Sequence, residues 1–191
     1  MAFDLEVAGG QVDAFAVFDG VGGMPGGSEA SQTAARFLRA VLAQVARADQ
    51  VLPLLSATVA KATRGMSTAA LLLSSTSGDW IASAGDSSVY VLAGGRPMRV
   101  NQHDSAGHGH LTAALGGKIG DGHAVPVGVV VGTSLLLCTD GIDAVLPSHK
   151  LVRPLSAPIS GMGEAVDRLV ADVLRHGAPD NATVVLARRI A

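Results

Sequence analysis

The stretch FAVFDGVGG, residues 15–23, decides the fold, because its apolar run ends at Asp19 and a glycine-rich loop follows at once. Two other stretches also combine an aspartate with an apolar run. In LLLCTDGI (135–142) the apolar run ends at Asp140, and in APDNATVVLAR (178–188) Asp180 comes just before the apolar run. Each aspartate alone is typical of a turn, so the hypothesis rests on their joint occurrence. Carboxylates brought together at strand ends repel one another unless a cation lies between them. Hard cations such as Mg²⁺ and Mn²⁺ take these oxygen ligands, and the Gly20 carbonyl is a further candidate. The pattern indicates metal-assisted hydrolysis.

Length and composition set the outer limits. The chain has 191 residues and 48% hydrophobic content, which predicts one compact domain over residues 1–191. A formal charge of −2 gives no reason to expect nucleic acid as a partner. Cys138 is the only cysteine, so no internal disulfide can form, which favours a reducing compartment. The first ten residues, MAFDLEVAGG, do not resemble a secretory signal, and no apolar run is long enough to span a membrane. We therefore expect a cytoplasmic protein with no membrane partner.

Hydrophobic periodicity predicts the secondary structure. Helical spacing indicates helices over 30–46, 49–63 and 163–176, with Ser28 as the first N-cap and Pro53 near the start of the second helix. Strands are expected over 12–18, 68–74, 80–84, 87–92, 97–100, 133–139 and 182–187, with hairpin turns at Gly78-Asp79 and Gly94-Gly95. Because strands gather in the middle of the chain and helices towards its ends, the class is α+β.

Six motifs in order resemble the metal-dependent protein phosphatases, the type 2C serine/threonine phosphatases. They are VFDGVGG with the following GGSEAS, GMSTAALLL (65–73), SAGDSSVYVL (83–92), LTAALGG (111–117), LLLCTDGI and PDNATVVL. The resemblance spans nearly the whole chain. It implies a sandwich of two antiparallel β-sheets flanked by helices on both faces.

The resemblance also implies a site that holds two Mn²⁺ or Mg²⁺ ions. If the family's ligands are assigned to the matching positions of this chain, Asp19 bridges both ions, Asp140 and Asp180 bind one of them, and the Gly20 carbonyl binds the other. Asp86 matches a ligand of a third, weaker ion in many bacterial members. Asp4 matches the last acidic residue of the family's N-terminal segment. A water between the ions would attack phosphorus in line, which makes Asp19, Asp140 and Asp180 the expected catalytic residues. The expected substrates are phosphoserine and phosphothreonine proteins or small phosphomonoesters.

The chain also departs from the family pattern. It begins too late for the arginine that grips the substrate phosphate, so we expect weak substrate binding carried mostly by the ions. Val21 supplies no general acid and fits bacterial members better, and Ser88 stands where the family often has arginine. The segment between Asp86 and Leu111 is too short for the usual flap. These departures keep one alternative open: a weak or inactive phosphatase-like binding module.

In place of the flap, the chain has the loop NQHDSAGHGH, residues 101–110. Its histidines, His103, His108 and His110, could bind a transition metal or donate a proton to a leaving group. The favoured interpretation is a solvated polar loop. Cys138, within an apolar run, is interpreted as a core residue rather than a nucleophile.

Overall fold

The computed structural model describes residues 2–7, 10–23, 25–106 and 110–191, with side chains from residue 12 onward. Its strands form two antiparallel sheets, one of five strands in the order β1-β2-β3-β4-β7 and one of four in the order β6-β5-β8-β9. The strands are β1 Ala2–Val7, β2 Gly10–Val17, β3 Ala69–Ser75, β4 Gly78–Ala84, β5 Ser88–Ala93, β6 Arg96–Arg99, β7 His123–Val127, β8 Ser134–Cys138 and β9 Val184–Arg188. The predicted sandwich of two antiparallel sheets is therefore confirmed.

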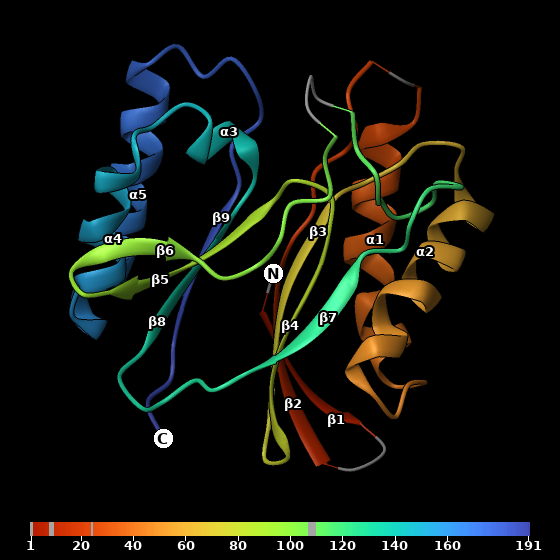
Figure 1. Cartoon of the computed structure of the whole chain (residues 1–191), viewed down its shortest axis with the longest axis horizontal. Coiled ribbons are helices and arrows are strands. Elements are labelled where there is room, and N and C mark those ends of the chain that lie inside the picture. The colour runs from red at the N-terminus through yellow and green to blue at the C-terminus, as the bar shows by residue number, and fades with distance from the viewer. Residues whose placement is uncertain (1, 8–9, 24, 107–109) are drawn as a thin grey trace.

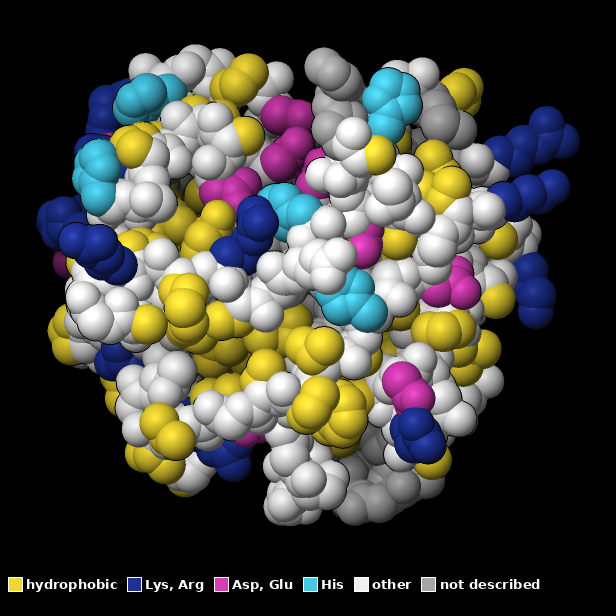
Figure 2. Space-filling view, viewed as in Figure 1, with side chains coloured by type: hydrophobic (Ala, Val, Ile, Leu, Met, Phe, Trp, Pro, Cys, Tyr) yellow, Lys and Arg dark blue, Asp and Glu magenta, His cyan; other side chains and the backbone are white. Residues whose placement is uncertain are grey.

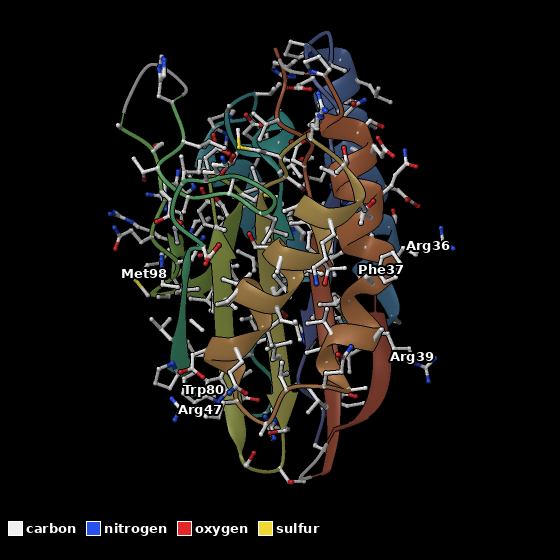
Figure 3. The ribbon with its side chains drawn as sticks, turned by 90° about the vertical axis from the view of Figure 1, so that its right-hand side faces the viewer. Arg36, Phe37, Arg39, Arg47, Trp80 and Met98 are labelled. Atoms are coloured by element: carbon white, nitrogen blue, oxygen red, sulfur yellow. The ribbon has the colours of Figure 1, made fainter. Side chains whose placement is uncertain are left out.

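Helices cover both outer faces of the sandwich, as Figure 1 shows. The helices are α1 Gly27–Leu42, α2 Val51–Ala62, α3 Asp140–Asp143, α4 Val152–Ser156 and α5 Met162–Arg175, and the short 3₁₀ turns are η1 Ala48–Gln50, η2 Ser148–Leu151 and η3 Ile159–Gly161. Helices α1 and α2 lie on the five-stranded sheet, whereas α4 and α5 lie on the four-stranded sheet. Figure 3 looks onto the α1 and α2 side, where Trp80 and Arg47 lie close together.

Three apolar layers hold these four layers of secondary structure together. The first joins α1 and α2 to the five-stranded sheet through residues such as Leu38 and Leu71. The second lies between the sheets and includes Leu72 and Leu137. The third joins the four-stranded sheet to α3, α4 and α5, and Cys138 is fully buried in it, as expected of a core residue. Small and aliphatic side chains fill all three layers, in keeping with the 3% aromatic content.

The predicted elements are confirmed in most places, and the structure corrects the others. Helix α1 begins earlier than expected, with Gly26 rather than Ser28 at its N-cap, and ends at Leu42. The turn predicted at Gly78-Asp79 lies at residues 76–77, because Ser75 pairs with Gly78 and both predicted turn residues belong to β4. The strands β1 and β7 and the short helices α3 and α4 were not expected. The Gly94-Gly95 turn is confirmed, since both glycines have the positive φ of a type I′ hairpin.

An ion pair joins the two sheets at the end of β4 remote from Asp86. The Nη1 atom of Arg189, just after β9, lies 2.7 Å from Oδ1 of Asp79 in β4. The Asp79 side chain is only 7% exposed, and it also accepts hydrogen bonds from the Ser74 hydroxyl at 2.6 Å and the Val129 amide at 3.2 Å. The carboxylate thus has one cationic partner and two neutral hydrogen-bond donors, which is how a buried charge is tolerated.

Removing Arg189 should destabilise the protein. We expect Arg189→Ala to lower the free energy of unfolding by about 2 kcal/mol, below the 3–5 kcal/mol of a fully buried pair because Arg189 is partly exposed. Urea unfolding measures the effect. Arg168→Ala is the control, because it breaks an exposed pair with Glu164 on α5 and should change the midpoint little. Equal midpoints for the two variants would contradict the role of the Asp79 pair.

Candidate metal centre

The loop after β2 carries Asp19, and Thr68, the residue just before β3, holds it in place. The amide of Thr68 donates a 2.8 Å hydrogen bond to the Asp19 carbonyl, and the Thr68 hydroxyl accepts one from the Asp19 amide at 3.2 Å. The Thr68 hydroxyl also lies 2.7 Å from that of Ser87, the residue next to Asp86. Thr68 and Ser87 are both buried, so they link the Asp19 and Asp86 loops through one rigid contact.

The glycines after Asp19 allow backbone to touch backbone. A Cβ atom on Gly20 would lie 2.3 Å from the carbonyl carbon of Gly27, the first residue of α1. A Cβ on Gly65 would lie 2.0 Å from the carbonyl oxygen of Gly26. The glycine-rich loop is therefore a close-packed support between β2, α1 and the start of β3, and only glycine permits this approach.

A second support brings Asp140 and Asp180 together. Asp140 is the first residue of α3, two positions after the end of β8, and Asp180 lies in the exposed loop before β9. The buried Thr139 hydroxyl donates to the Asn181 carbonyl at 3.3 Å and accepts from the Thr183 amide at 3.0 Å. Gly141 lies so close to this loop that a Cβ there would be 2.3 Å from the Asn181 carbonyl oxygen. The two acidic motifs, forty residues apart in sequence, thus share one anchored edge.

The carboxylates of Asp19, Asp86, Asp140 and Asp180 influence one another electrostatically. Burial first, and then the charges of Asp140 and Asp180, raise the pKa of Asp19 to about 7, and Asp86 adds to the effect. Burial, followed by the charges of Asp86 and Asp180, also raises the pKa of Asp140. A side-chain interaction with Asp140 contributes further to the raised pKa of Asp19. Four carboxylates from distant motifs thus converge, and Figure 2 shows acidic side chains gathered at one edge of the molecule.

Bringing these carboxylates together should lower the stability of the metal-free protein, and this loss can be measured. Because the pKa of Asp19 rises from 3.8 to about 7 on folding, its destabilising effect is absent below pH 4, grows between pH 4 and 7, and is complete above that range. In the presence of a chelator, we expect Asp19→Asn to raise the melting temperature at pH 8 but not at pH 4. Asp167→Asn, which removes an exposed carboxylate of α5, should give the same difference from the parent protein at both pH values. A pH-independent effect of Asp19→Asn would contradict the repulsion.

The donor set fits hard cations. All four side chains offer carboxylate oxygen, the ligand that Mg²⁺ and Mn²⁺ prefer. Across the described ranges, no three His, Cys, Asp or Glu side chains form a group that could enclose one ion. The structure therefore does not show the expected set of Asp19, Asp140 and Asp180 closed around one ion. Mg²⁺ sites commonly use one or two carboxylates and retain several waters, so pairs of these aspartates remain suitable donors.

The other predicted site residues have different surroundings. Asp4 lies in β1 and pairs with Asp13 of β2. Because Asp13 precedes Asp19 by six positions along the chain, this register does not bring Asp4 beside Asp19. Gly20 directly follows Asp19, and an isolated bridge pairs it with Ser67. His108 lies outside the described residues, and His110 is exposed. His103 is half-buried and hydrogen-bonded, so it does not behave as part of a solvated loop.

Three supporting residues, Thr68, Ser87 and Thr139, were not recognised from the sequence. Their motifs are part of the family resemblance, yet a hydroxyl within an apolar or small-residue stretch gives no sign of its partner. Thr68 and Ser87 are 19 residues apart, and Thr139 and Thr183 are 44 apart, so only the fold shows these contacts. The sequence offered one indication of a supporting role, which is that each of these hydroxyl residues lies next to or near a candidate aspartate.

Comparisons with known proteins agree with this fold. No protein-family model and no curated protein matches the sequence. Among solved structures, the chain is similar to the serine/threonine phosphatase of S. agalactiae, with a TM-score of 0.77, 15% identity and coverage of 100% of this chain and 92% of the other. It is similar to PppA of Pseudomonas aeruginosa, with a TM-score of 0.73, 26% identity and coverage of 98% and 89%. It is also similar to the catalytic domain of PstP, solved with two manganese ions, with a TM-score of 0.72, 24% identity and coverage of 98% and 91%.

The chain thus has the fold of the bacterial PPM serine/threonine phosphatases, as its motifs predict. The similarity extends over essentially the full length of each chain. Among the described residues, no helix is both long and apolar enough to cross a membrane.

Proposed function

We propose that this protein is a divalent-metal-dependent phosphomonoester hydrolase that acts on phosphoserine and phosphothreonine in proteins. The convergence of Asp19, Asp86, Asp140 and Asp180 carries this proposal. Together with burial, the charges of the other three raise the pKa of Asp19, and those of Asp86 and Asp180 raise the pKa of Asp140, so a bound cation would relieve the repulsion. The manganese ions in the similar PstP structure support the same assignment. The alternative of an inactive binding module is not favoured, because decay of the site would relax the need to keep these carboxylates together.

Asp19, Asp140 and Asp180 are the proposed principal ligands, with the Gly20 carbonyl beside them and Asp86 in an accessory role. When bound, Mn²⁺ or Mg²⁺ would supply an activated water and offset charge that develops on the phosphoryl oxygens. The protein holds these carboxylates in position through hydrogen bonds to the loops that carry them. Thr68 and Ser87 anchor the Asp19 and Asp86 loops, and Thr139 anchors the Asp140 and Asp180 motifs. We leave Asp4 out of the proposed ligand set because of its register.

Metal-dependent hydrolysis tests the proposal directly. Purified protein treated with a chelator should hydrolyse an aryl phosphate only after Mn²⁺ or Mg²⁺ is restored, and the same preparation should release phosphate from phosphoserine and phosphothreonine peptides. Calorimetry should detect Mn²⁺ binding. A rate that does not change with Mn²⁺, together with no heat of metal binding, would instead identify a phosphatase-like module without turnover.

Asp86 should matter less than Asp19. It is half-buried on the connection from β4 to β5, at the margin of the cluster. We expect Asp86→Ala to reduce hydrolysis mainly at limiting Mn²⁺ and to recover most activity at saturation. A titration of rate against Mn²⁺ concentration measures this. A collapse at saturating Mn²⁺ as deep as that of an Asp19 variant would show that Asp86 is a principal ligand.

A further inference from the structure

Arg99 and His103 form a pair just after β6. The Nη1 atom of Arg99 lies 3.1 Å from both Nδ1 and Nε2 of His103, so the guanidinium is in close contact with the imidazole ring. The same Nε2 atom also lies 2.8 Å from the hydroxyl of Ser88 in β5. Ser88 is buried and His103 is half-buried. The ring is therefore held by the sheet, and it in turn orients an arginine.

This pair lies at the margin of the acidic cluster. Ser88 follows Asp86 by two residues, and the negative charges of Asp143 and Asp86 both reach His103. Tyr90, the next residue on the same face of β5, donates a 2.9 Å hydrogen bond from its hydroxyl to Asp143 in α3, the helix that Asp140 begins. Figure 2 shows basic and histidine side chains next to one another close to the acidic ones on this face.

The guanidinium of Arg99 has donors to spare. Arginine carries five N–H donors in a planar fork, and the contacts of Arg99 with His103 involve only Nη1. In the part of the chain that the structure describes, Arg99 forms no ion pair, although an acidic cluster lies near it. Its side chain is exposed. Burial and the charge of Arg99 lower the pKa of His103, so the ring adds no second charge at neutral pH.

We propose that Arg99, positioned by His103 and Ser88, binds the phosphoryl group of the substrate beside the carboxylate cluster. An oriented fork with free donors matches the oxygens of a phosphomonoester dianion and can bind two of them at once. This inference rests on the proposed function, because it concerns the phosphate of that substrate. It revises the expectation from sequence that the ions alone carry most of the phosphate binding. Arg99 is the substrate-binding residue, and His103 is a positioning residue.

Arg99→Ala tests the proposal against Arg96→Ala. Arg96 is an exposed arginine three positions earlier in β6, so it points to the opposite face of the strand and is matched in charge. With Mn²⁺ present, we expect Arg99→Ala to raise both the KM for an aryl phosphate and the dissociation constant of inorganic phosphate about tenfold, with a smaller change in kcat. Arg96→Ala should leave both constants unchanged. Arg99→Lys should fall between, because it keeps the charge but loses the fork.

The positioning role of His103 has its own readout. His103→Ala should raise KM without altering Mn²⁺ affinity, and His103→Gln, which keeps a hydrogen-bonding group for Ser88, should restore part of the loss. Equal unfolding midpoints would show that all variants are folded. If Arg99→Ala and Arg96→Ala give the same KM and the same phosphate affinity, the proposal is wrong. Calorimetry with inorganic phosphate also separates the two hypotheses, because it reports on Arg99 even if the parent protein shows no Mn²⁺-stimulated hydrolysis.

Discussion

Replacing Asp19 with asparagine should reduce Mn²⁺-stimulated hydrolysis of an aryl phosphate by more than about a hundredfold. Loss of residues that only support metal ligands typically costs 10–100-fold, and Asp19 is proposed as a ligand itself, so the loss should exceed that range. Asparagine keeps the size of the side chain but removes the charge at the centre of the four-carboxylate cluster. Initial rates across a Mn²⁺ titration, with calorimetry of Mn²⁺ binding, measure both consequences.

The control for this experiment is Asp167→Asn, which removes one exposed carboxylate from α5 and should leave the rates unchanged. Because Asp19→Asn also relieves repulsion in metal-free protein, its loss of activity should come with a higher melting temperature at pH 8. Full activity in the Asp19 variant would refute the assignment of this site. Loss of activity together with a lower melting temperature would instead indicate misfolding.

Replacing Gly141 with alanine should damage both stability and activity. The added methyl group would lie 2.3 Å from the carbonyl oxygen of Asn181, so α3 and the loop that carries Asp180 must move apart. Forcing an extra carbon into a packed site costs about 1–3 kcal/mol, and we expect the upper part of this range because the obstacle is backbone. A displacement of about 1 Å between catalytic groups can cost a hundredfold in rate, and we expect a loss of that order.

Gly163→Ala is the matched control, since a Cβ at this position in α5 would contact nothing within 4 Å. It should leave hydrolysis unchanged and stabilise the protein by up to about 1 kcal/mol, because alanine favours a helix over glycine. Urea unfolding and initial rates distinguish the two substitutions. If Gly141→Ala matches Gly163→Ala in both, the tight approach of the two motifs is not needed for the site.

The sequence was most informative where a chemically distinctive residue lies beside an apolar run or a clear turn signal. Asp19, Asp140 and Asp180 could be placed at strand ends because apolar runs beside them mark buried strands, and the fold brings their charges together. The Gly94-Gly95 hairpin could be predicted because two adjacent glycines suit a type I′ turn. The nearby Gly78-Asp79 pair misled the prediction because Asp79 is needed in β4 as the partner of Arg189, a residue 110 positions away.

What sequence reasoning missed depends on contacts between distant residues. The strand β7 carries Pro126 and half-exposed positions, so its alternation is weak and only its pairing with β4 identifies it. The contact of His103 with Ser88 spans 15 residues and turns a polar loop into an ordered pair. A single polar residue in sequence does not reveal its partner, and so Arg99 and His103 could not be connected to the acidic cluster beforehand.

The four carboxylates do not belong to one sheet. Asp19 follows a strand of the five-stranded sheet, Asp140 and Asp180 flank strands of the four-stranded sheet, and Asp86 lies on the crossover between them. The spacing of any ion site they form is therefore set by the distance at which the two sheets dock. Fully buried Ala70 contributes to that docking. Evolution or design could thus tune the proposed ion site from the middle of the sandwich, by thickening or thinning its central layer, without altering any of the four carboxylates.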